Sequence, residues 1–160
     1  MTMKWTQKDG IVELALARPP CNEIGTEMLE GFERFLSELE SKTTRALIIY
    51  STLESGFSAG ADLRELYKKI LLRPKSEHTR EMRKFLDRIH RVMDAIDMLP
   101  FMTIGVIHGP CFGGGFELAL TCDVLIAEPT ARFCFPELRL GIIPCFGGIP
   151  RLRRDLGNGV

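Results

Sequence analysis

Apolar residues recur along the chain with two alternating periods. In residues 11–16 they include Val12 and Leu14 on one side of an extended segment, which predicts a half-buried strand. From Thr26 to Lys42 they return every three or four residues, which predicts an amphipathic helix with Thr26 as its N-cap. Residues 46–50 form a short, β-branched run typical of a buried strand. The first third of the chain thus predicts a strand, a helix and a second strand.

The alternation continues to the end of the chain. Asp62, with Glu65 three residues later, has the pattern of a capped helix start. A long helix is predicted over residues 76–99, ended by Pro100. Further strands are expected at 102–107, 123–127 and 131–135, with a brief helix after Glu117 and another helix start at 147–151. Strands that alternate with helices favour an α/β fold.

Composition and charge narrow the function classes. The 160 residues contain 21 Lys and Arg against 21 Asp and Glu, which argues against a nucleic-acid partner. The length predicts one domain, 1–160, and no apolar run is long enough to predict a membrane span. The five cysteines are odd in number and scattered, so we expect reduced thiols and a cytoplasmic protein. They form no paired spacing that would predict a metal site.

Two glycine-rich turns and two carboxylates carry the candidate chemistry. The segments 58–62 (SAGAD) and 112–117 (FGGGFE) each precede a predicted helix, where free backbone N–H groups suit an anion or a developing oxyanion. Glu117 follows the second turn at the start of an apolar run, and Glu137 follows an aromatic strand. Two carboxylates held in one apolar cleft could act as an acid–base pair. Turns and solvated carboxylates are the plainer interpretation of each feature taken alone.

Several motifs, in order, resemble the enoyl-CoA hydratase/isomerase (crotonase) superfamily. They are the segments 18–22 (RPPCN), 57–63 (FSAGADL), 108–123 (HGPCFGGGFELALTCD), 135–144 (FPELRLGIIP) and 147–152 (GGIPRL). The resemblance covers nearly the whole chain and is closest to an enoyl-CoA hydratase. It implies a crotonase-type spiral of ββα units. The family's C-terminal helical region is not found in this chain, so the resemblance also implies a domain truncated at its C-terminus.

The same resemblance implies roles for individual residues. The N–H groups of Ala61 and Gly114 would form the oxyanion hole for an acyl-CoA thioester, with Glu117 and Glu137 as the catalytic acid–base pair. We expect Glu117 to act on water and Glu137 to supply the proton. Further substrate-binding positions are expected at Ala59, Asp62, Leu63, Arg64, Gly113, Pro136, Gly141 and Phe146. Arg64 stands where the family often has a lysine near the phosphates of coenzyme A.

The implied reaction is reversible syn hydration of a 2-enoyl-CoA to a 3-hydroxyacyl-CoA, as in fatty acid metabolism. No separate cofactor is expected, because coenzyme A is part of the substrate. The full-length protein is expected to be a homotrimer or a dimer of trimers. Phe146 is bulkier than the small residue common after the family's proline, and it would narrow or redirect the acyl pocket.

Three alternatives compete with the hydratase. Another crotonase-type activity, as isomerase, dehydratase or lyase, would use the same fold, and a non-catalytic acyl-CoA-binding relative would keep it without turnover. Residues 56–60 also read G-x-S-x-G, which would make Ser58 the nucleophile of a serine hydrolase with His108. That pattern requires its serine directly after a strand. Here residues 52–57 separate Ser58 from the predicted strand, which argues against the hydrolase.

Overall fold

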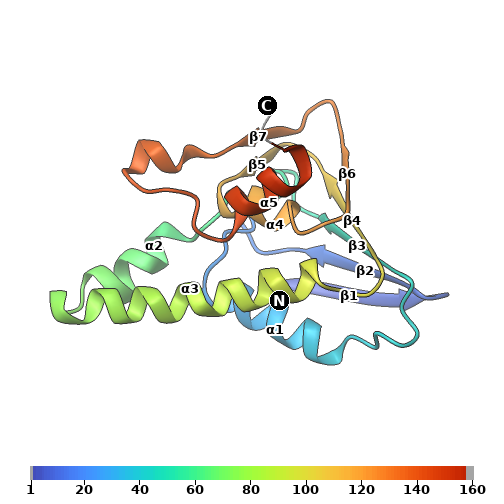
Figure 1. Ribbon diagram of the computed structural model, residues 1–160, viewed down its shortest axis with the longest axis horizontal. Coiled ribbons are helices and arrows are strands. Elements are labelled where there is room, and N and C mark those ends of the chain that lie inside the picture. Colours follow the sequence, from blue (N-terminus) through green and yellow to red (C-terminus); the bar gives the residue numbers. More distant parts are fainter. Residues whose placement is uncertain (1, 158–160) are drawn as a thin grey trace.

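The computed structural model describes residues 2–157, which form a five-stranded sheet, a two-stranded sheet and connecting helices (Figure 1). The strands of the large sheet are β1 (Met3–Lys8), β2 (Ile11–Leu16), β3 (Ala46–Ser51), β4 (Met102–Ile107) and β6 (Val124–Ala127). They lie in the order β1-β2-β3-β4-β6. β1 and β2 are antiparallel, and every later pair is parallel. Each strand of this sheet is therefore placed beside the previous one.

Two consecutive strands followed by a helix recur along the chain. The small sheet pairs β5 (Pro110–Phe112) with β7 (Arg132–Cys134). The helices are α1 (Thr26–Glu38), α2 (Leu63–Leu66) with the π-helix η1 (Tyr67–Leu71), α3 (Lys75–Asp97), α4 (Gly114–Ala119), the 3₁₀ helix η2 (Pro136–Leu140) and α5 (Gly148–Leu156). The units β1-β2-α1, β4-β5-α4 and β6-β7-α5 confirm the expected α/β fold of ββα units.

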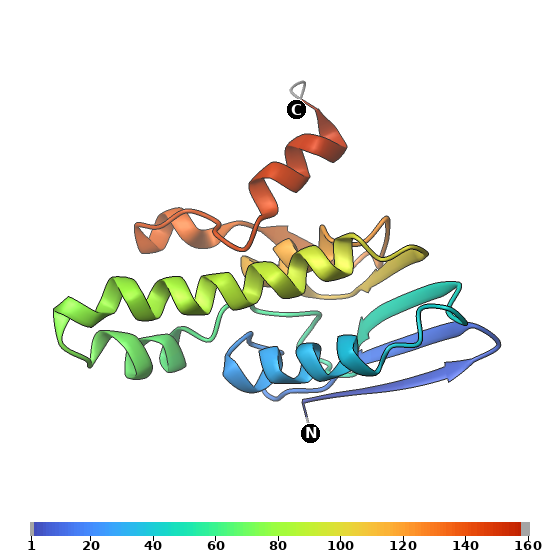
Figure 2. The same cartoon turned by 60° about the horizontal axis from the view of Figure 1, so that its bottom comes forward.

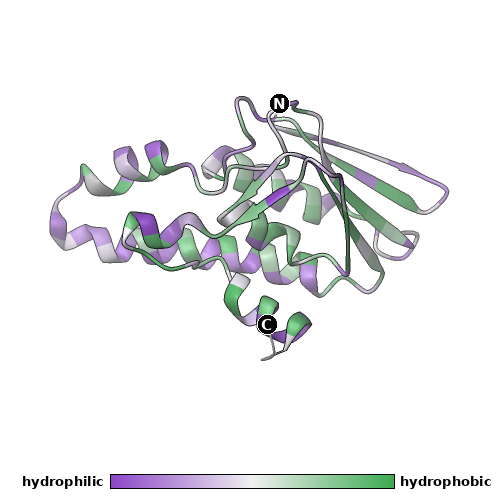
Figure 3. Ribbon diagram, turned by 90° about the horizontal axis from the view of Figure 1, so that it is seen from above, coloured by the Kyte–Doolittle hydropathy of each residue, from purple (hydrophilic) through white to green (hydrophobic). Residues whose placement is uncertain are grey.

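The core lies between the large sheet and the two longest helices. Figures 1 and 2 show α3 running beside α1, and the two helices are in contact. Phe32 and Phe35 of α1 and Ile89 of α3 are fully buried, as is Leu14 of the sheet. Figure 3 shows the inner strands of the large sheet largely green and α3 striped with purple, because one face of the helix meets the core and the other meets water. Burial of this apolar surface is the main stabilising contribution to the fold.

Most predicted elements are present, with differences at their ends. The strands at 11–16 and 102–107 are confirmed, and α3 begins and ends within two residues of its expected limits. The helix predicted over 26–42 ends at Glu38, because Leu39 adopts an extended conformation. Strands β1 and β5 were not predicted: β1 is mostly exposed, and β5 has only three residues.

The expected caps have different outcomes. Asp62 caps α2 as predicted, since its Oδ1 accepts the N–H of Glu65 at 2.9 Å. Thr26 is not the N-cap of α1; Gly25 holds that position. The N–H of Thr26 donates instead to the carboxylate of Glu65, at 3.1 and 3.2 Å. A side chain from α2 therefore serves the start of α1.

Two expectations concern the limits of the chain and the membrane. The predicted domain spans residues 1–160, of which residue 1 and residues 158–160 lie outside the described part. None of the helices within residues 2–157 combines the length and apolar character required to cross a bilayer.

Candidate active site

Glu117 lies in the first turn of α4 and is almost completely buried, with 1% of its surface exposed. The preceding Gly113 has φ 49° and ψ −126°, a conformation that favours glycine and lets β5 turn directly into α4. The Oε1 atom of Glu117 accepts the N–H groups of Phe146 and Gly148, each at 2.8 Å. A segment about thirty residues further along the chain therefore fixes this carboxylate.

The protonation of Glu117 is set by competing effects. Burial raises the pKa of Glu117 above its usual value, because the charged form loses its hydration. The N–H groups of Gly148 and Phe146 favour the charged form and oppose that effect, while the nearby Glu137 carboxylate raises the pKa further. Burial prevails, so the pKa of Glu117 lies above its usual value, the direction expected for a carboxyl group that exchanges protons with a substrate.

Glu137 belongs to η2 and is 7% exposed. Its Oε2 atom is buried and accepts no hydrogen bond from any residue in the described part of the chain. Buried polar atoms in proteins usually have a partner, and an exception at a cavity indicates a place for water or a ligand. Glu137 thus offers an unpaired oxygen beside the buried Glu117.

The two backbone N–H groups expected to bind a carbonyl oxygen lie close together. A β-carbon on Gly60 would lie 3.0 Å from the nitrogen of Gly114, and one on Gly114 would lie 3.5 Å from the nitrogen of Ala61. Within residues 2–157, no residue accepts a hydrogen bond from the N–H of Ala61 or of Gly114. Two unpaired donors from separate loops therefore meet at the start of α4.

A cavity of about 80 Å³ brings these groups together. Both carboxylates and both N–H residues line it, as do five expected substrate-binding residues: Ala59, Leu63, Gly113, Pro136 and Phe146. Leu140, Ile142 and Cys145 also line it and were not predicted as site residues. Their signal in the sequence was the apolar run that follows Glu137. The wall is mainly apolar, with a few polar groups directed inward, which is typical of a small-molecule site.

Three expected substrate-binding residues do not line this cavity. Gly141 ends η2 in the left-handed conformation and has open space around it. Asp62 and Arg64 line a second, larger hollow of about 520 Å³. The substrate-binding roles of these three residues remain predictions.

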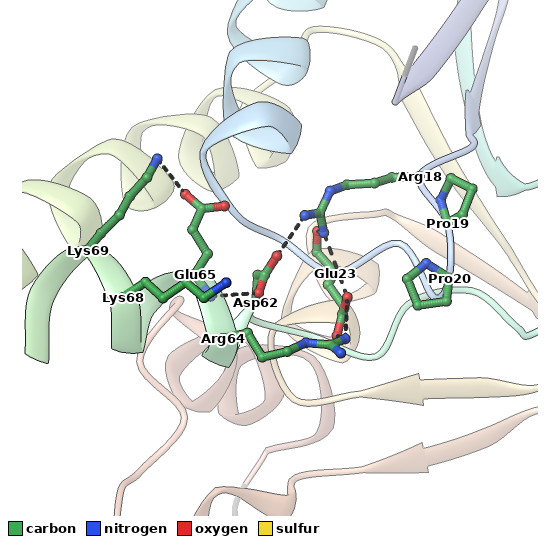
Figure 4. A pocket seen from close by; sticks show the side chains of 9 residues that line it. All are labelled: Arg18, Pro19, Pro20, Glu23, Asp62, Arg64, Glu65, Lys68 and Lys69. Carbon is green, nitrogen blue, oxygen red and sulfur yellow. Dashed lines mark hydrogen bonds and ion pairs between the residues drawn. The ribbon is translucent and has the colours of Figure 1, made fainter. Parts of the chain in front are cut away.

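The second hollow is charged, with four basic and three acidic side chains (Figure 4). Arg18 binds Asp62 through Nη2 and Oδ2 at 2.6 Å, and Arg64 binds Glu23 at 3.0 Å. Burial by itself would raise the pKa of Asp62, but the N–H of Glu65 and the guanidinium of Arg18 outweigh it and hold that pKa below its usual value. Asp62 therefore joins α2 to the segment after β2.

Ser58 and His108 do not form a catalytic pair. The hydroxyl group of Ser58 is buried and donates to the carbonyl oxygen of Asn22 at 2.8 Å. The Nε2 atom of His108 lies 2.8 Å from the carbonyl oxygen of Leu53. Both side chains are thus engaged with the backbone, which leaves the serine hydrolase without a nucleophile and base in contact.

The succession of ββα units defines a crotonase-type protein. The family model described as enoyl-CoA hydratase/isomerase matches residues 6–160, and the chain belongs to this family. It is similar to the short-chain-enoyl-CoA hydratase of Clostridium acetobutylicum, with 34% identity over 157 residues that cover 96% of this chain and 57% of that protein. It is also similar to the mitochondrial methylglutaconyl-CoA hydratase of Rattus norvegicus, with 37% identity over 150 residues that cover 92% of this chain and 45% of that protein.

Solved structures show the same fold. The crystal structure of an enoyl-CoA hydratase from Bacillus anthracis matches with a TM-score of 0.86 and 31% identity, over 99% of this chain and 60% of that one. The chain therefore spans roughly half the length of the curated relatives it matches. The fold and the family are established over nearly the whole of this chain.

Proposed function

We propose that the protein is an enoyl-CoA hydratase, which adds water reversibly to the double bond of a 2-enoyl-CoA thioester. The observation that carries the proposal is the convergence of two buried carboxylates and two unpaired backbone N–H groups on one cavity. Family membership supports an acyl-CoA thioester as the substrate. Coenzyme A then enters as part of the substrate, and the chain's own carboxylates move the protons.

In the proposed mechanism the thioester oxygen lies between the N–H groups of Ala61 and Gly114. Negative charge develops on this oxygen when water attacks Cβ, and the two fixed donors stabilise the resulting enolate. They need no reorganisation during the reaction, because they belong to the backbone of two packed loops. The start of α4 adds the positive end of its peptide dipoles at the same place.

The two carboxyl groups divide the proton transfers. Oε1 of Glu117 is held by two N–H groups, which leaves Oε2 to take a proton from the attacking water. Glu137 supplies a proton to Cα as the enolate collapses, so the elements of water are added across the double bond. Glu117 then holds one proton more and Glu137 one fewer, and proton exchange with solvent restores both.

The charged hollow beside this cavity fits the other end of the substrate. Arg64 and Lys68 line it together with Arg18, and their cations would attract the phosphates of coenzyme A. Arg64 replaces the lysine common in the family, and its planar fork can contact two phosphate oxygens at once. We further propose that the full-length protein is cytoplasmic, serves fatty acid metabolism, and assembles as a homotrimer or a dimer of trimers.

The test is a spectrophotometric assay of crotonyl-CoA hydration with the full-length protein, following the loss of the conjugated thioester absorbance. Glu117→Gln and Glu137→Gln should each lower kcat by about a hundredfold or more, the range expected for loss of a general acid or base. Glu128→Gln, which changes an exposed carboxylate outside the cavity, should leave kcat unchanged. Circular dichroism confirms that each variant is folded.

A parent protein that binds crotonyl-CoA without hydrating it would refute the hydratase and direct attention to isomerase or lyase substrates. A parent that hydrates crotonyl-CoA while one Gln variant keeps full activity would refute the role of that glutamate alone.

A further inference from the structure

Arg151 is a buried arginine of α5 with four hydrogen-bonding partners. It is 6% exposed, although arginine is usually at the surface. Its Nη2 donates to Asp94 at 2.6 Å and its Nε to Asp97 at 3.2 Å, both on α3. Its Nη1 donates to the carbonyl oxygens of Phe146 and Gly147, at 3.4 and 3.1 Å. The guanidinium group therefore ties the segment before α5 to α3.

The same segment holds Glu117 from its other side. The carbonyl oxygens of Phe146 and Gly147 point to Arg151, whereas the N–H groups of Phe146 and Gly148 point to Glu117. The carbonyl of Gly147 and the N–H of Gly148 belong to one peptide unit, which is planar. Turning that unit away from Arg151 would also turn its N–H away from Glu117.

Consecutive glycines make this double contact possible. Gly147 has φ 95°, and a β-carbon there would overlap the guanidinium of Arg151. A β-carbon on Gly148 would lie 2.6 Å from Cγ of Glu117. Each glycine thus leaves room for one of the two side chains that flank the segment.

We propose that Arg151 is a positioning residue that fixes the orientation of the Phe146–Gly148 backbone and thereby the carboxylate of Glu117. The importance of this link for turnover rests on the proposed function. The link itself is a property of the backbone and can be tested without substrate.

The ionisable groups that face Glu117 come from α3, from η2 and from the segment that follows η2. Glu137 of η2 raises the pKa of Glu117, and His90 of α3 lowers the pKa of Glu117. The thiol of Cys145 also faces the cavity. All three are retained when Arg151 is replaced, so a change in the titration of Glu117 can be assigned to the segment that Arg151 holds.

The experiment follows the amide signals of Phe146 and Gly148 by ¹H–¹⁵N NMR across a pH titration. In the parent both amides should shift as Glu117 ionises, and Glu117→Gln should abolish that shift. Arg151→Lys keeps the positive charge but cannot reach four acceptors in the same geometry. It should reduce the amide shifts and raise the midpoint of the Glu117 titration by about one pH unit, the effect of losing one hydrogen bond to a charged group.

Arg154→Lys is the matched control. Arg154 of α5 also binds Asp97 of α3, but none of the hydrogen bonds of Arg154 reaches the Phe146–Gly148 backbone. This variant should titrate like the parent. A folded Arg151→Lys variant that also titrates like the parent would overturn the proposal.

Asp94→Ala covers the case in which Arg151→Lys does not fold. The Asp94 side chain is 63% exposed, so its removal leaves the core intact while Arg151 loses a partner. Loss of a negative charge alone would lower the Glu117 midpoint or leave it unchanged, and either result would overturn the proposal. Loss of positioning would raise the midpoint.

Crotonyl-CoA turnover then separates this proposal from the proposed function. If the parent hydrates the substrate, Arg151→Lys should lower kcat by about a hundredfold, as a misplaced catalytic group does, with a smaller change in KM. If the parent has no hydratase activity but its amides respond as described, the hydratase proposal fails and the role of Arg151 in positioning Glu117 stands.

Discussion

A β-carbon on Gly113 would lie 2.6 Å from Oε1 of Glu137. The two residues come from different ββα units, so the absence of a side chain at one position makes room for the carboxylate at the other. Gly113 also adopts a backbone conformation that favours glycine. Its substitution would therefore impose two separate penalties.

Gly113→Ala should destabilise the protein by about 1–3 kcal/mol through backbone strain and should also displace Glu137. We expect hydratase activity to fall by about a hundredfold, measured beside urea unfolding. Gly157→Ala is the control: Gly157 also has a positive φ, 70°, but an added β-carbon would meet nothing within 4 Å. It should lose stability and keep activity. Equal activity in the two variants would contradict the role assigned to crowding at Glu137.

Phe146 limits the space beside the two carboxylates. Its ring lies so close to α4 that a β-carbon on Gly114 would be 2.5 Å from Cε2 of Phe146. The ring also packs edge to face against Phe85 of α3, with 5.9 Å between the ring centroids. With a cavity of about 80 Å³, we expect the parent to prefer short acyl chains. The departure noted in the sequence at this position thus becomes a prediction about substrate size.

Phe146→Ala should raise the ratio of kcat/KM for an eight-carbon over a four-carbon enoyl-CoA by about tenfold or more, because each methylene group that finds space contributes to binding. The variant should also lose about 3–5 kcal/mol of stability. Phe101→Ala removes a partly buried ring outside the cavity. It should cost stability without changing the ratio, and a similar change of ratio in both variants would refute the assignment.

Asp62 should make stability depend on acid pH. Its pKa is held below the ordinary 3.8, so the folded state favours the charged form. This contribution is complete above the pKa of the unfolded chain and is lost as the pH falls through the lower folded value. Asp62→Asn should therefore be less stable than the parent by about 1–3 kcal/mol at pH 7, since Arg18 loses the nearest of its three carboxylate partners.

The difference between Asp62→Asn and the parent should shrink below about pH 3.8 as the parent's own carboxyl is protonated. Urea unfolding at several pH values measures it, with the exposed Glu13→Gln as the control for general charge effects. A destabilisation that stays constant down to the lowest pH would indicate lost packing and not a lost charge.

The five cysteines should differ in reactivity. Burial raises the pKa of Cys111 and of Cys122 to about 12, so neither forms the reactive thiolate at neutral pH. Cys134 is exposed on β7. Iodoacetamide at pH 8, followed by mass spectrometry, should modify Cys134 first and reach Cys111 and Cys122 only after unfolding. Early modification of Cys111 or Cys122 would contradict the burial described for them.

The sequence predicted the elements with strong periodicity and missed those without it. The stripe of α3 and the β-branched run of β3 carry clear signals. In contrast, β1 (MKWTQK) lies at the edge of the sheet, and Met3 is its one fully buried residue. Its sequence therefore shows little alternation of apolar and polar residues. The end of α1 was also missed, because Leu39 continues the apolar stripe although its backbone is already extended.

For the candidate site, sequence motifs identified most of the cavity lining but not the contacts that hold it. Glu117 and Glu137 were named from their motifs, and both line the cavity. The N–H groups that bind Glu117 lie 29 and 31 residues away, and Asp94 and Arg151 are 57 residues apart. Pairings over such distances depend on how the units pack, which no local pattern contains.

The strand order of the large sheet has a consequence for synthesis on the ribosome. Since each strand pairs with the one made before it, the amino-terminal units can fold while later ones are still being translated. The cavity is different, because its wall takes Ala61, Gly114 and finally Phe146 from successive parts of the chain. A nascent polypeptide thus pairs its first strands before its cavity is complete, and ligand can stabilise only those molecules in which the segment with Phe146 has docked.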